Sequence, residues 1–385
     1  MQRLRVLHII PSLNKGGAER LVIDICKCLS SLKLAEVLLV VLSTENEYPE
    51  SIENVNIKHC SSKVIPSLSG KSKVYLDDFV NIVNDFKPNI IHSHLFEAEI
   101  LSRWKIFSEI KYVTHCHDNI RQYRNFELTC LSTKSCITEF YEKKIIFNRY
   151  RKCKNNFIAV SVNNENYLKQ NLPKELHKIT LLNNAIDFHK FKNTSRITKS
   201  IADKNNIELV TVGRLDVNKN QSFLVDVVKM LNDKGYNTTL EILGDGPTRQ
   251  SIENKISALE LSEKIFCRGN INDVEKYLHQ SDIYVHSALS ESFGLVMLET
   301  MAAGLPVVCL DAKGNRDIIE NGKNGFMIYD QNCELFADKI IKLIEDKELY
   351  NSISNYAIAF AAKYDIKIYV QNLLDLYNSL FLHHV

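Results

Sequence analysis

The sequence predicts an α/β protein with two domains, each built on a doubly wound parallel sheet. The chain has 385 residues, which is more than one hydrophobic core accommodates and suits two domains of ordinary size. Short β-branched runs alternate with longer segments of helical periodicity, a pattern typical of strands joined by crossover helices. This pattern stops at residues 181–192 and then starts again, so it indicates two separate sheets.

The first sheet is predicted from five apolar runs in the first half of the chain. We expect strands at residues 4–10, 36–42, 90–92, 111–115 and 157–161. The first run resembles the apolar part of a signal peptide, but Arg5 and His8 interrupt it and no small-residue cleavage site follows. We therefore interpret it as a strand.

The second sheet is predicted from the runs at residues 207–212, 239–243, 265–267, 283–286 and 306–310. We expect an N-terminal domain at 1–182, a C-terminal domain at 183–365, and a final helix at 366–385 that packs back on the N-terminal domain. Parallel sheets of this kind bind ligands beyond the carboxyl ends of their strands. We therefore expect the two Rossmann-like sheets to face a central cleft, with the functional residues at strand ends.

The composition excludes several classes of protein. The apolar fraction of 45% and the charged fraction of 24% are those of an ordinary globular protein. No apolar run approaches the roughly 18–20 residues that span a bilayer. The ten cysteines are scattered, with close pairs only at Cys26 and Cys28 and at Cys130 and Cys136. We expect reduced cytoplasmic thiols and no metal site.

Charge is distributed unevenly along the chain. The net charge is +2, but residues 1–185 contain 26 basic and 19 acidic side chains, whereas residues 186–385 contain 22 and 27. The least regular segment, 119–154, ends in residues 141–154, where aromatic and aliphatic side chains alternate with six cations. A helix here could rest on anionic lipid headgroups. The alternative is a solvated basic helix packed on its own domain, and we expect no nucleic-acid partner.

The strongest motif lies at residues 290–308 and reads SESFGLVMLETMAAGLPVV. Glu291 precedes a helix that we expect to begin near Phe293, and Gly304 followed by Pro306 ends it. Glu299 then lies about two turns into the helix.

The start of that helix suits a phosphate group. The backbone N–H groups of Gly294 and Leu295 carry the positive end of the helix dipole, and the glycine allows close approach. Two carboxylates near such a site, at Glu291 and Glu299, suggest that they accept hydrogen bonds from hydroxyl groups, as a sugar and a ribose would supply.

Two basic residues occur in the sequence VGRLDVNKNQ. Arg214 comes just after a predicted strand, and Lys219 lies in the following loop. A guanidinium and an ammonium at this spacing could stabilise the charge of a diphosphate without a metal. The alternative is an exposed pair of loop residues.

Three glycine turns follow predicted strands. LEILGDGPTR contains Gly244, CRGNI contains Arg268 and Gly269, and IIPSLNKGGAERLV contains Gly16 and Gly17. Each is an ordinary tight turn by propensity. The first loop lacks the third glycine of a dinucleotide fingerprint, which disfavours an NAD-dependent dehydrogenase.

Histidines end two neighbouring strands. The sequence VTHCHDNI contains His115 and His117, and the preceding strand ends near His92 and His94. A single histidine is more often structural than catalytic, so this pattern leaves the choice between His115 and His117 open.

The Glu, seven residues, Glu motif resembles that of the large retaining glycosyltransferase family four, and the resemblance extends over most of the chain. It implies the two-domain GT-B fold. It also implies that Glu291 contacts hydroxyls of the donor sugar, that Glu299 contacts the ribose, and that Arg214 and Lys219 stabilise the diphosphate.

The resemblance implies further donor contacts. His117, followed by Asp118, matches the family histidine that faces the donor sugar better than His115 does. The other residues implied in donor binding are Gly16, Gly17, Gly244, Arg268, Gly269, Phe293, Gly294 and Leu295. The chain departs from the family pattern at Ala185, where Gly is usual, and at Asp317, where Glu is commoner.

The activity implied by the resemblance is transfer, with retention, from a nucleotide diphosphate sugar to a carbohydrate or lipid-linked acceptor. A UDP-sugar and cell-surface polysaccharide biosynthesis are favoured, with no cofactor or metal. We expect a cytoplasmic enzyme that contacts the inner face of the membrane peripherally. The alternatives are a nucleotide-sugar epimerase or sugar phosphorylase of the same architecture, or a catalytically silent nucleotide-binding subunit. The intact set of Arg214, Lys219, Glu291 and Glu299 argues against the silent subunit.

Overall fold

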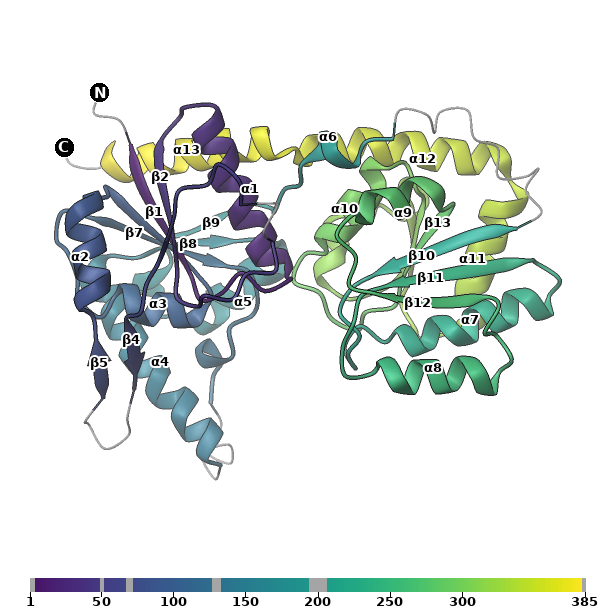
Figure 1. Cartoon of the computed structure of the whole chain (residues 1–385), viewed down its shortest axis with the longest axis horizontal. Coiled ribbons are helices and arrows are strands. Elements are labelled where there is room, and N and C mark those ends of the chain that lie inside the picture. The colour runs from purple at the N-terminus through teal and green to yellow at the C-terminus, as the bar shows by residue number, and fades with distance from the viewer. Residues whose placement is uncertain (1–3, 49–51, 67–71, 127–132, 194–205, 383–385) are drawn as a thin grey trace. The chain divides into compact units, whose positions relative to one another are not determined.

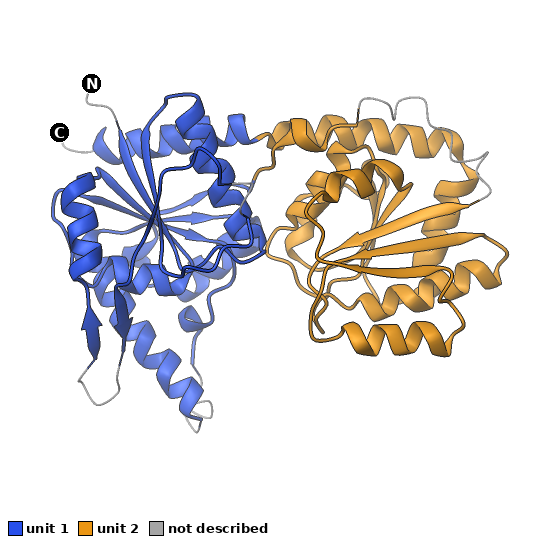
Figure 2. Cartoon of the chain, viewed as in Figure 1, with its two compact units in different colours: residues 1–184, 366–385 blue, residues 185–365 orange. Residues whose placement is uncertain are grey.

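The computed structural model describes residues 4–48, 52–66, 72–126, 133–193 and 206–382. The chain divides into two compact units, residues 1–184 with 366–385, and residues 185–365 (Figure 2). Each unit contains a parallel sheet with helices on both faces (Figure 1). The predicted fold class is therefore confirmed.

Unit 1 is built on seven parallel strands in the order β3-β2-β1-β6-β7-β8-β9. The strands are β1 (Arg5–Ile10), β2 (Glu36–Val41), β3 (Ile57–His59), β6 (Ile90–His94), β7 (Lys111–Cys116), β8 (Asn156–Ala159) and β9 (Ile179–Leu181). The helices are α1 (Gly17–Ser31), α2 (Asp77–Phe86), α3 (Phe96–Ser102), α4 (Lys134–Cys153), α5 (Val162–Asn171) and α13 (Ile366–Leu382). The strand order reverses direction at β1, which is where sheets of this class bind ligands.

Unit 2 is built on six parallel strands in the order β12-β11-β10-β13-β14-β15. The strands are β10 (Ile207–Val212), β11 (Thr238–Leu243), β12 (Ile265–Gly269), β13 (Ile283–His286), β14 (Val307–Leu310) and β15 (Gly325–Ile328). The helices are α6 (Phe188–Phe191), α7 (Gln221–Asp233), α8 (Arg249–Ala258), α9 (Val274–Gln280), α10 (Leu295–Ala302), α11 (Cys333–Glu345) and α12 (Lys347–Ala361).

All ten predicted strands are present, but five short strands were not predicted. β3 and β9 lie at the edges of the unit 1 sheet and are largely exposed, so they lack the apolar run of a central strand. β15 begins at a glycine on the edge of the unit 2 sheet. The remaining two, β4 (Lys63–Ile65) and β5 (Lys73–Tyr75), form a separate antiparallel pair.

The segment predicted to be least regular contains a helix of 20 residues, α4. Thr133 caps its start, since its side chain accepts a hydrogen bond from the backbone N–H of Cys136. The buried face of α4 packs into the core of unit 1 through Ile146, Phe147 and Tyr150. Phe147 and Tyr150 thus lie on an internal face of the helix, whereas Tyr141 is half-buried.

The final helix, α13, belongs to unit 1, where it packs on α1. Its apolar residues at positions 366, 370, 373 and 374 are buried, as is Tyr377. The spacing of three to four residues is that of a helix with one face in the core. This helix therefore covers one face of the unit 1 sheet, as Figure 1 shows.

The cysteines correct one expectation. Among the described residues, the cysteines at positions 26, 28, 60, 116, 153, 267, 309 and 333 form no disulfide, but Cys136 is disulfide-bonded. The expectation of reduced thiols throughout was therefore wrong at Cys136.

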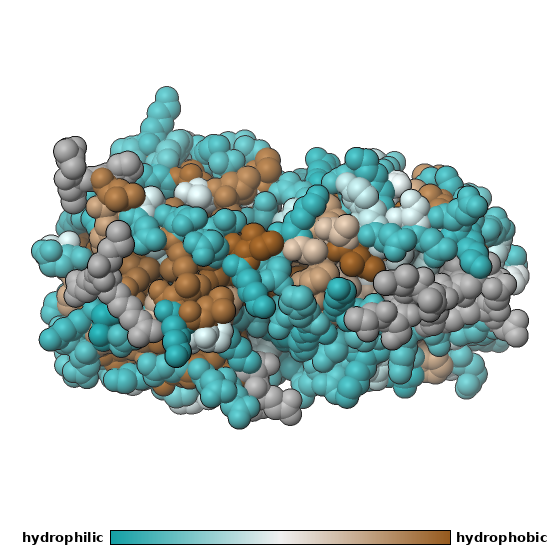
Figure 3. Space-filling model, turned by 90° about the horizontal axis from the view of Figure 1, so that it is seen from above, coloured by the Kyte–Doolittle hydropathy of each residue, from teal (hydrophilic) through white to brown (hydrophobic). Residues whose placement is uncertain are grey.

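The surface in the view of Figure 3 is mostly hydrophilic, with apolar residues gathered over part of unit 1. Large exposed apolar side chains in unit 1 include Leu32, Leu34, Ile368, Phe381 and Leu382. Within the described residues, no helix is both long enough and apolar enough to cross a bilayer.

Candidate functional site

The carboxyl edge of the unit 2 sheet holds two loops that are joined by hydrogen bonds. One follows β10 and the other follows β13. Asn218 donates to the carbonyl of Ser290 at 2.9 Å and accepts from the backbone N–H of Leu289 at 2.8 Å. Ser287 Oγ donates to the carbonyl of Lys219 at 2.8 Å. These bonds fix the loop that carries Lys219 against the loop that carries Glu291.

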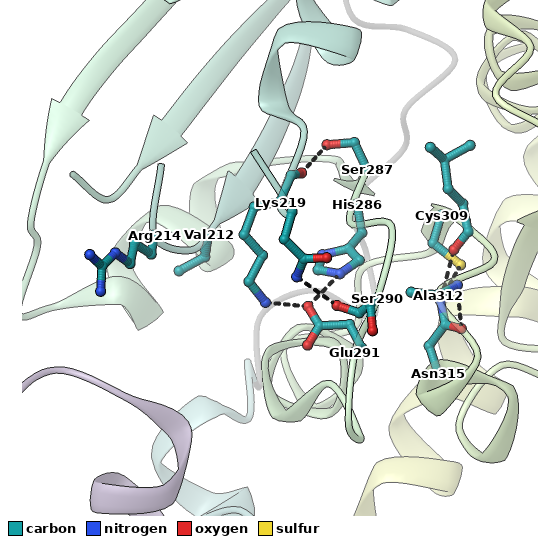
Figure 4. Close-up of polar contacts among 12 residues, drawn as sticks. Val212, Arg214, Lys219, His286, Ser287, Ser290, Glu291, Cys309, Ala312 and Asn315 are labelled. Atoms are coloured by element: carbon teal, nitrogen blue, oxygen red, sulfur yellow. Dashed lines mark hydrogen bonds and ion pairs between the residues drawn. The ribbon is translucent and has the colours of Figure 1, made fainter. Parts of the chain in front are cut away.

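The two loops bring Lys219 and Glu291 into direct contact (Figure 4). The Lys219 ammonium donates to Glu291 Oε1, and His286 Nε2 lies 3.0 Å from the same oxygen. Tyr284 Oη lies 3.1 Å from His286 Nδ1. The N–H on Nε2 donates to the carboxylate, and Nδ1 faces the tyrosine hydroxyl. The sequence predicted Lys219 and Glu291 as separate contacts to the sugar donor. The structure joins them in one cluster with His286 and Tyr284, called the Glu291 cluster below.

The cluster keeps Glu291 ionised. Burial alone would raise its pKa, since only 11% of the side chain is exposed. The hydrogen bond and charge of His286, together with the Lys219 ammonium, outweigh burial and lower the pKa of Glu291 from 4.5 to about 2. At neutral pH this carboxylate is therefore a hydrogen-bond acceptor only.

The backbone of Glu291 is held by the loop that follows β14. Its N–H donates to the carbonyl of Ala312 at 2.9 Å, and the N–H of Ala312 donates to Asn315 Oδ1 at 3.1 Å. A Cβ at Gly314 would lie 2.1 Å from the carbonyl oxygen of Glu291. Only glycine allows this approach, so Gly314 helps to set the position of the loop that carries Glu291.

Helix α10 starts immediately after this loop, at Leu295, two residues later than predicted. Gly294 is its N-cap residue and has a φ of +93°, a left-handed conformation that favours glycine. Within the part of the chain that the structure describes, the backbone N–H groups of Gly294 and Leu295 have no hydrogen-bond partner. They remain available to an anion, while the ring of Phe293 is buried beside them.

Glu299 is the fifth residue of α10, so it lies just over one turn into the helix and not two. Its charge acts on Tyr284, the ring that also contacts His286. Burial, followed by the charges of Glu291 and Glu299, raises the pKa of Tyr284 well above its usual value. Both motif glutamates therefore lie close enough to Tyr284 to act on its hydroxyl electrostatically.

Arg214 lies at the end of β10 but outside the cluster. Its side chain is exposed, and Figure 4 shows the guanidinium turned away from Lys219 and Glu291. Among the described residues it has no ion-pair or hydrogen-bond partner, whereas its backbone carbonyl accepts from Gln221 Nε2 at 3.0 Å. The guanidinium is therefore uncommitted.

The two glycine turns of unit 2 bring strand ends together. A Cβ at Gly244 would lie 2.1 Å from the carbonyl oxygen of Gly213, and the N–H of Gly244 donates to the carbonyl of Gly269 at 2.8 Å. Arg268 is engaged elsewhere, because its guanidinium makes two hydrogen bonds to Glu241, at 2.6 and 2.9 Å. The backbone of this turn, more than the Arg268 side chain, is available to a ligand.

In unit 1, the glycine loop follows β1. Gly16 is the N-cap of α1, and Gly17 is its first residue. Tyr48 braces the loop, since its hydroxyl lies 3.0 Å from both the N–H and the carbonyl of Gly16. A Cβ at Gly16 would meet the carboxylate of Glu19 at 2.3 Å.

The candidate histidines lie at the end of β7. His117 is 9% exposed, and its Nε2 lies 2.9 Å from Nδ1 of His94. His115 stacks on His117 with ring centroids 4.1 Å apart. Burial lowers the pKa of His117 to about 3, so its ring is neutral. Of the two, only His117 reaches past the end of the strand.

The sequence analysis did not identify four residues that build the Glu291 cluster: Asn218, His286, Gly314 and Asn315. His286 offered a signal, because it ends a predicted strand five residues before Glu291. The others act through backbone approach or loop hydrogen bonds, which no spacing in the sequence reveals.

Comparison with known proteins agrees with this geometry. The family described as "Glycosyl transferases group 1" matches residues 174–360, and "Glycosyltransferase Family 4" matches residues 15–190. These two matches together extend over most of both units.

Relatives that match most of the chain include two bacterial glycosyltransferases. The chain is 28% identical over 306 residues to the capsular polysaccharide biosynthesis glycosyltransferase CapM of Staphylococcus aureus, covering 76% of this chain and 77% of CapM. It is 25% identical over 379 residues to the N-acetylgalactosamine-N,N'-diacetylbacillosaminyl-diphospho-undecaprenol 4-alpha-N-acetylgalactosaminyltransferase of Campylobacter jejuni, covering 95% of this chain and 96% of that enzyme.

A solved structure shares the fold. HepE of Anabaena, in complex with UDP and glucose, matches with a TM-score of 0.79 and 20% identity over 98% of this chain and 100% of HepE. Because the two family matches cover both units and this neighbour has the same fold, the chain belongs to glycosyltransferase family four and is a glycosyltransferase of GT-B fold.

Proposed function

We propose that this enzyme transfers a sugar, with retention of configuration, from a UDP-sugar to a carbohydrate or lipid-linked acceptor in cell-surface polysaccharide biosynthesis. The observation that carries the proposal is the Glu291 carboxylate, held ionised by Lys219 and His286 next to the unpaired N–H groups that start α10. An ionised buried carboxylate accepts hydrogen bonds from sugar hydroxyls. N–H groups at a helix start suit the adjoining diphosphate.

In this proposal, the diphosphate is stabilised by protein groups and not by a metal ion. Arg214 offers an exposed guanidinium with five donors, and Lys219 offers an ammonium that is 25% exposed. Such donors act most strongly where negative charge develops, here on the departing diphosphate. Glu299, one turn along α10, supplies an acceptor for the ribose hydroxyls.

The proposed chemistry is a front-face substitution. The bond from the anomeric carbon to the diphosphate oxygen breaks, the acceptor oxygen bonds to the same face, and the acceptor proton passes to the departing diphosphate. Glu291 is not proposed as a covalent nucleophile, since Lys219 and His286 both hold its Oε1. The neutral ring of His117 is proposed to orient the donor sugar.

Relatives support the choice of donor and acceptor. HepE was crystallised with UDP and with UDP-glucose, which favours UDP as the nucleotide. The Campylobacter enzyme is named for a diphospho-undecaprenol substrate, and CapM for capsular polysaccharide biosynthesis. We therefore favour a lipid-linked saccharide as the acceptor.

The donor is tested by thermal shift with UDP-, GDP- and ADP-sugars. A ligand that binds only the native state stabilises the protein by about 2.7 kcal/mol when its concentration is 100 times its Kd. The melting temperature rises accordingly. We expect UDP-sugars to give the largest shift. The same shift should shrink in Arg214→Gln and persist in the exposed-site control Glu263→Gln. A larger shift with GDP- or ADP-sugars would overturn the choice of base.

The reaction is tested by proton NMR of the anomeric signal of donor and product. Retention is expected, and an inverted product or a trapped glycosyl-enzyme would contradict the front-face mechanism. Nucleotide release that requires acceptor indicates a transferase. An isomerised nucleotide sugar without nucleotide release would indicate an epimerase, and nucleotide binding without turnover would indicate a silent subunit.

We also propose reversible contact with anionic membrane through α4. Its exposed cations, and not its aromatic residues, carry this proposal, because Phe147 and Tyr150 are buried. Lys143 donates to the carbonyls of Tyr123 and Arg124, so it is committed to its own unit. Beyond its first turn, the exposed lysines of the helix, with that of the C-cap residue, are Lys144, Lys152 and Lys154. Arg151 is also exposed, but it pairs with Glu175.

Liposome sedimentation tests this contact. Each basic residue near an anionic surface contributes about 1 kcal/mol, so replacing Lys144, Lys152 and Lys154 by Gln should weaken binding about 100-fold. Binding should require anionic lipid and fall steeply with salt. The matched control replaces three exposed lysines of the same unit outside α4: Lys58, Lys105 and Lys178. If the wild type ignores anionic liposomes at low salt, or the control loses as much binding as the test variant, this contact is wrong.

A further inference from the structure

Five buried histidines share one face of the unit 1 sheet. His8 of β1 pairs in register with His92 of β6, and His94 of β6 pairs with His115 of β7. His117 lies two residues beyond His115, so strand alternation places it on the same face. None of the five side chains is more than 9% exposed.

The ring nitrogens of this group converge. His8 Nδ1 lies 3.0 Å from His94 Nε2. One ring nitrogen from each of His8, His92 and His94 lies within 4.8 Å of the other two. Zinc bonds to imidazole nitrogen at about 2.0–2.1 Å, so tetrahedral ligand atoms lie roughly 3.3 Å apart. Side-chain rotation must therefore bring nitrogens that lie up to 4.8 Å apart to about 3.3 Å.

Two of these rings have a buried nitrogen without a partner. Within the described residues, His8 Nε2 and His92 Nε2 make no hydrogen bond. A buried polar atom without a partner costs about 1–3 kcal/mol. His92 Nε2 is therefore available as a ligand, and His8 can ligate through Nδ1, which already faces His94 Nε2.

The remaining nitrogens of His92 and His94 are held in the orientation that metal ligands require. His92 Nδ1 lies 2.6 Å from the hydroxyl of Tyr377 on α13, and His94 Nδ1 lies 2.9 Å from His117 Nε2. Ligating histidines commonly use their second nitrogen in such a contact, which fixes the tautomer and leaves Nε2 free to coordinate. His115 lacks this support, because within the described residues neither of its ring nitrogens has a hydrogen-bond partner.

We propose that His8, His92 and His94 bind one divalent transition-metal ion, of which Zn²⁺ is the best match. Three neutral imidazoles with an open fourth position form a known type of zinc site. Burial keeps these rings neutral, since it lowers the pKa of His8 to about 3 and those of His92 and His94 well below 6.5.

One positive charge opposes the proposal. The Arg103 guanidinium acts on His92, but it donates to Ser93 Oγ at 2.7 Å and to Thr114 Oγ1 at 2.8 Å. Ser93 and Thr114 alternate with the histidines along β6 and β7, so Arg103 lies across the sheet from the metal ligands. The backbone of the sheet thus separates the two charges.

The proposal does not depend on the transfer chemistry of unit 2, and metal content tests it directly. The protein is prepared without a tag, with His383→Gln and His384→Gln to remove the terminal histidine pair, from cells grown with added zinc. We expect about one equivalent of zinc by mass spectrometry after desalting. Less than a tenth of an equivalent, with no uptake of added Co²⁺, would overturn the proposal.

Co²⁺ gives a readout that does not depend on any substitution. In a three-histidine site with four ligands, it should show visible absorption bands of tetrahedral type. His8→Gln should weaken Co²⁺ binding more than tenfold, while His115→Gln and the surface control His59→Gln should leave it within twofold. Tyr377→Phe, which keeps the ring but removes the contact to His92, should weaken binding by about 10–100-fold. Equal binding in wild type and Tyr377→Phe, or loss confined to His115→Gln, would contradict the assigned triad.

Discussion

Replacement of Glu291 by Gln should destabilise unit 2 by an amount that depends on pH. Gln matches the shape of the protonated acid, so the substitution removes only what ionisation contributes. The pKa falls from 4.5 to about 2 on folding, which corresponds to about 3 kcal/mol at neutral pH. Loss of one partner from a buried ion pair costs about 3–5 kcal/mol, which is of the same order.

The sign of the pH dependence follows from the direction of the shift. The folded-state pKa lies below the unfolded value, so the ionised carboxylate stabilises the fold fully at pH values above about 5. This contribution is lost as the pH falls towards the folded-state pKa of about 2. The difference between wild type and Glu291→Gln should therefore shrink from about 3 kcal/mol at pH 7 to about 2 kcal/mol at pH 3.5.

The assay must separate the two units. Trp104 is the only tryptophan and belongs to unit 1, so its fluorescence follows that unit, whereas circular dichroism follows both. For a unit of this size, the unit 2 transition should drop by about 6–12 °C at pH 7. The control is Glu263→Gln, at an exposed glutamate of unit 2, which should lower the unit 2 melting temperature by less than about 2 °C. A difference below about 1 kcal/mol at pH 7, or one that grows as the pH falls, would refute the proposed ionisation of Glu291.

Three further predictions concern the transferase site. Glu299→Ala should weaken UDP binding in calorimetry, whereas Glu291→Ala should mainly lower kcat, because a sugar contact that strengthens in the transition state affects turnover. Equal loss of UDP affinity in both variants would contradict these roles. Activity should survive EDTA within about twofold, because Arg214, Lys219 and the start of α10 supply the positive field; rescue by Mg²⁺ or Mn²⁺ would show that a metal neutralises the diphosphate. Gly314→Ala should lower kcat at least tenfold in a folded protein, since its Cβ would displace the Glu291 carbonyl; an unchanged kcat would mean that this loop does not position the carboxylate.

The fold was predictable because both sheets are parallel and buried on two faces. Strands such as β2 and β14 are then continuous apolar runs, which stand out from the helices between them. The edge strands β3 and β9 were missed because each has a neighbouring strand on one side only and is largely exposed. Their sequences therefore contain no continuous apolar run. The same reasoning explains α4, whose charged sequence obscures a helix that is stabilised by packing of Phe147 and Tyr150.

The site was predictable only where chemistry resides in the residue type. Glu291, Glu299, Arg214 and Lys219 were singled out because carboxylates and cations near strand ends suggest a sugar and a diphosphate. The resemblance to family four implies their individual roles, which stay predictions. The contact between Lys219 and Glu291 was not predictable, because 72 residues separate them in the sequence and loops from β10 and β13 must meet. The histidine cluster had the same obstacle, since three strands contribute its rings.

The pairing of Lys219 with Glu291 has a consequence for donor binding. If Lys219 turns to a bound diphosphate, Glu291 loses one of its two partners and keeps His286, whose Nε2 remains 3.0 Å away. The hydrogen bond to His286 lowers the pKa of Glu291 more than the lysine does, so the carboxylate stays ionised after the lysine leaves. Glu291 Oε1 then has a vacant position for a sugar hydroxyl at the moment when Lys219 reaches the diphosphate. One movement of Lys219 would thus prepare both halves of the proposed donor site, which gives a reason for pairing this cation with this carboxylate before the donor arrives.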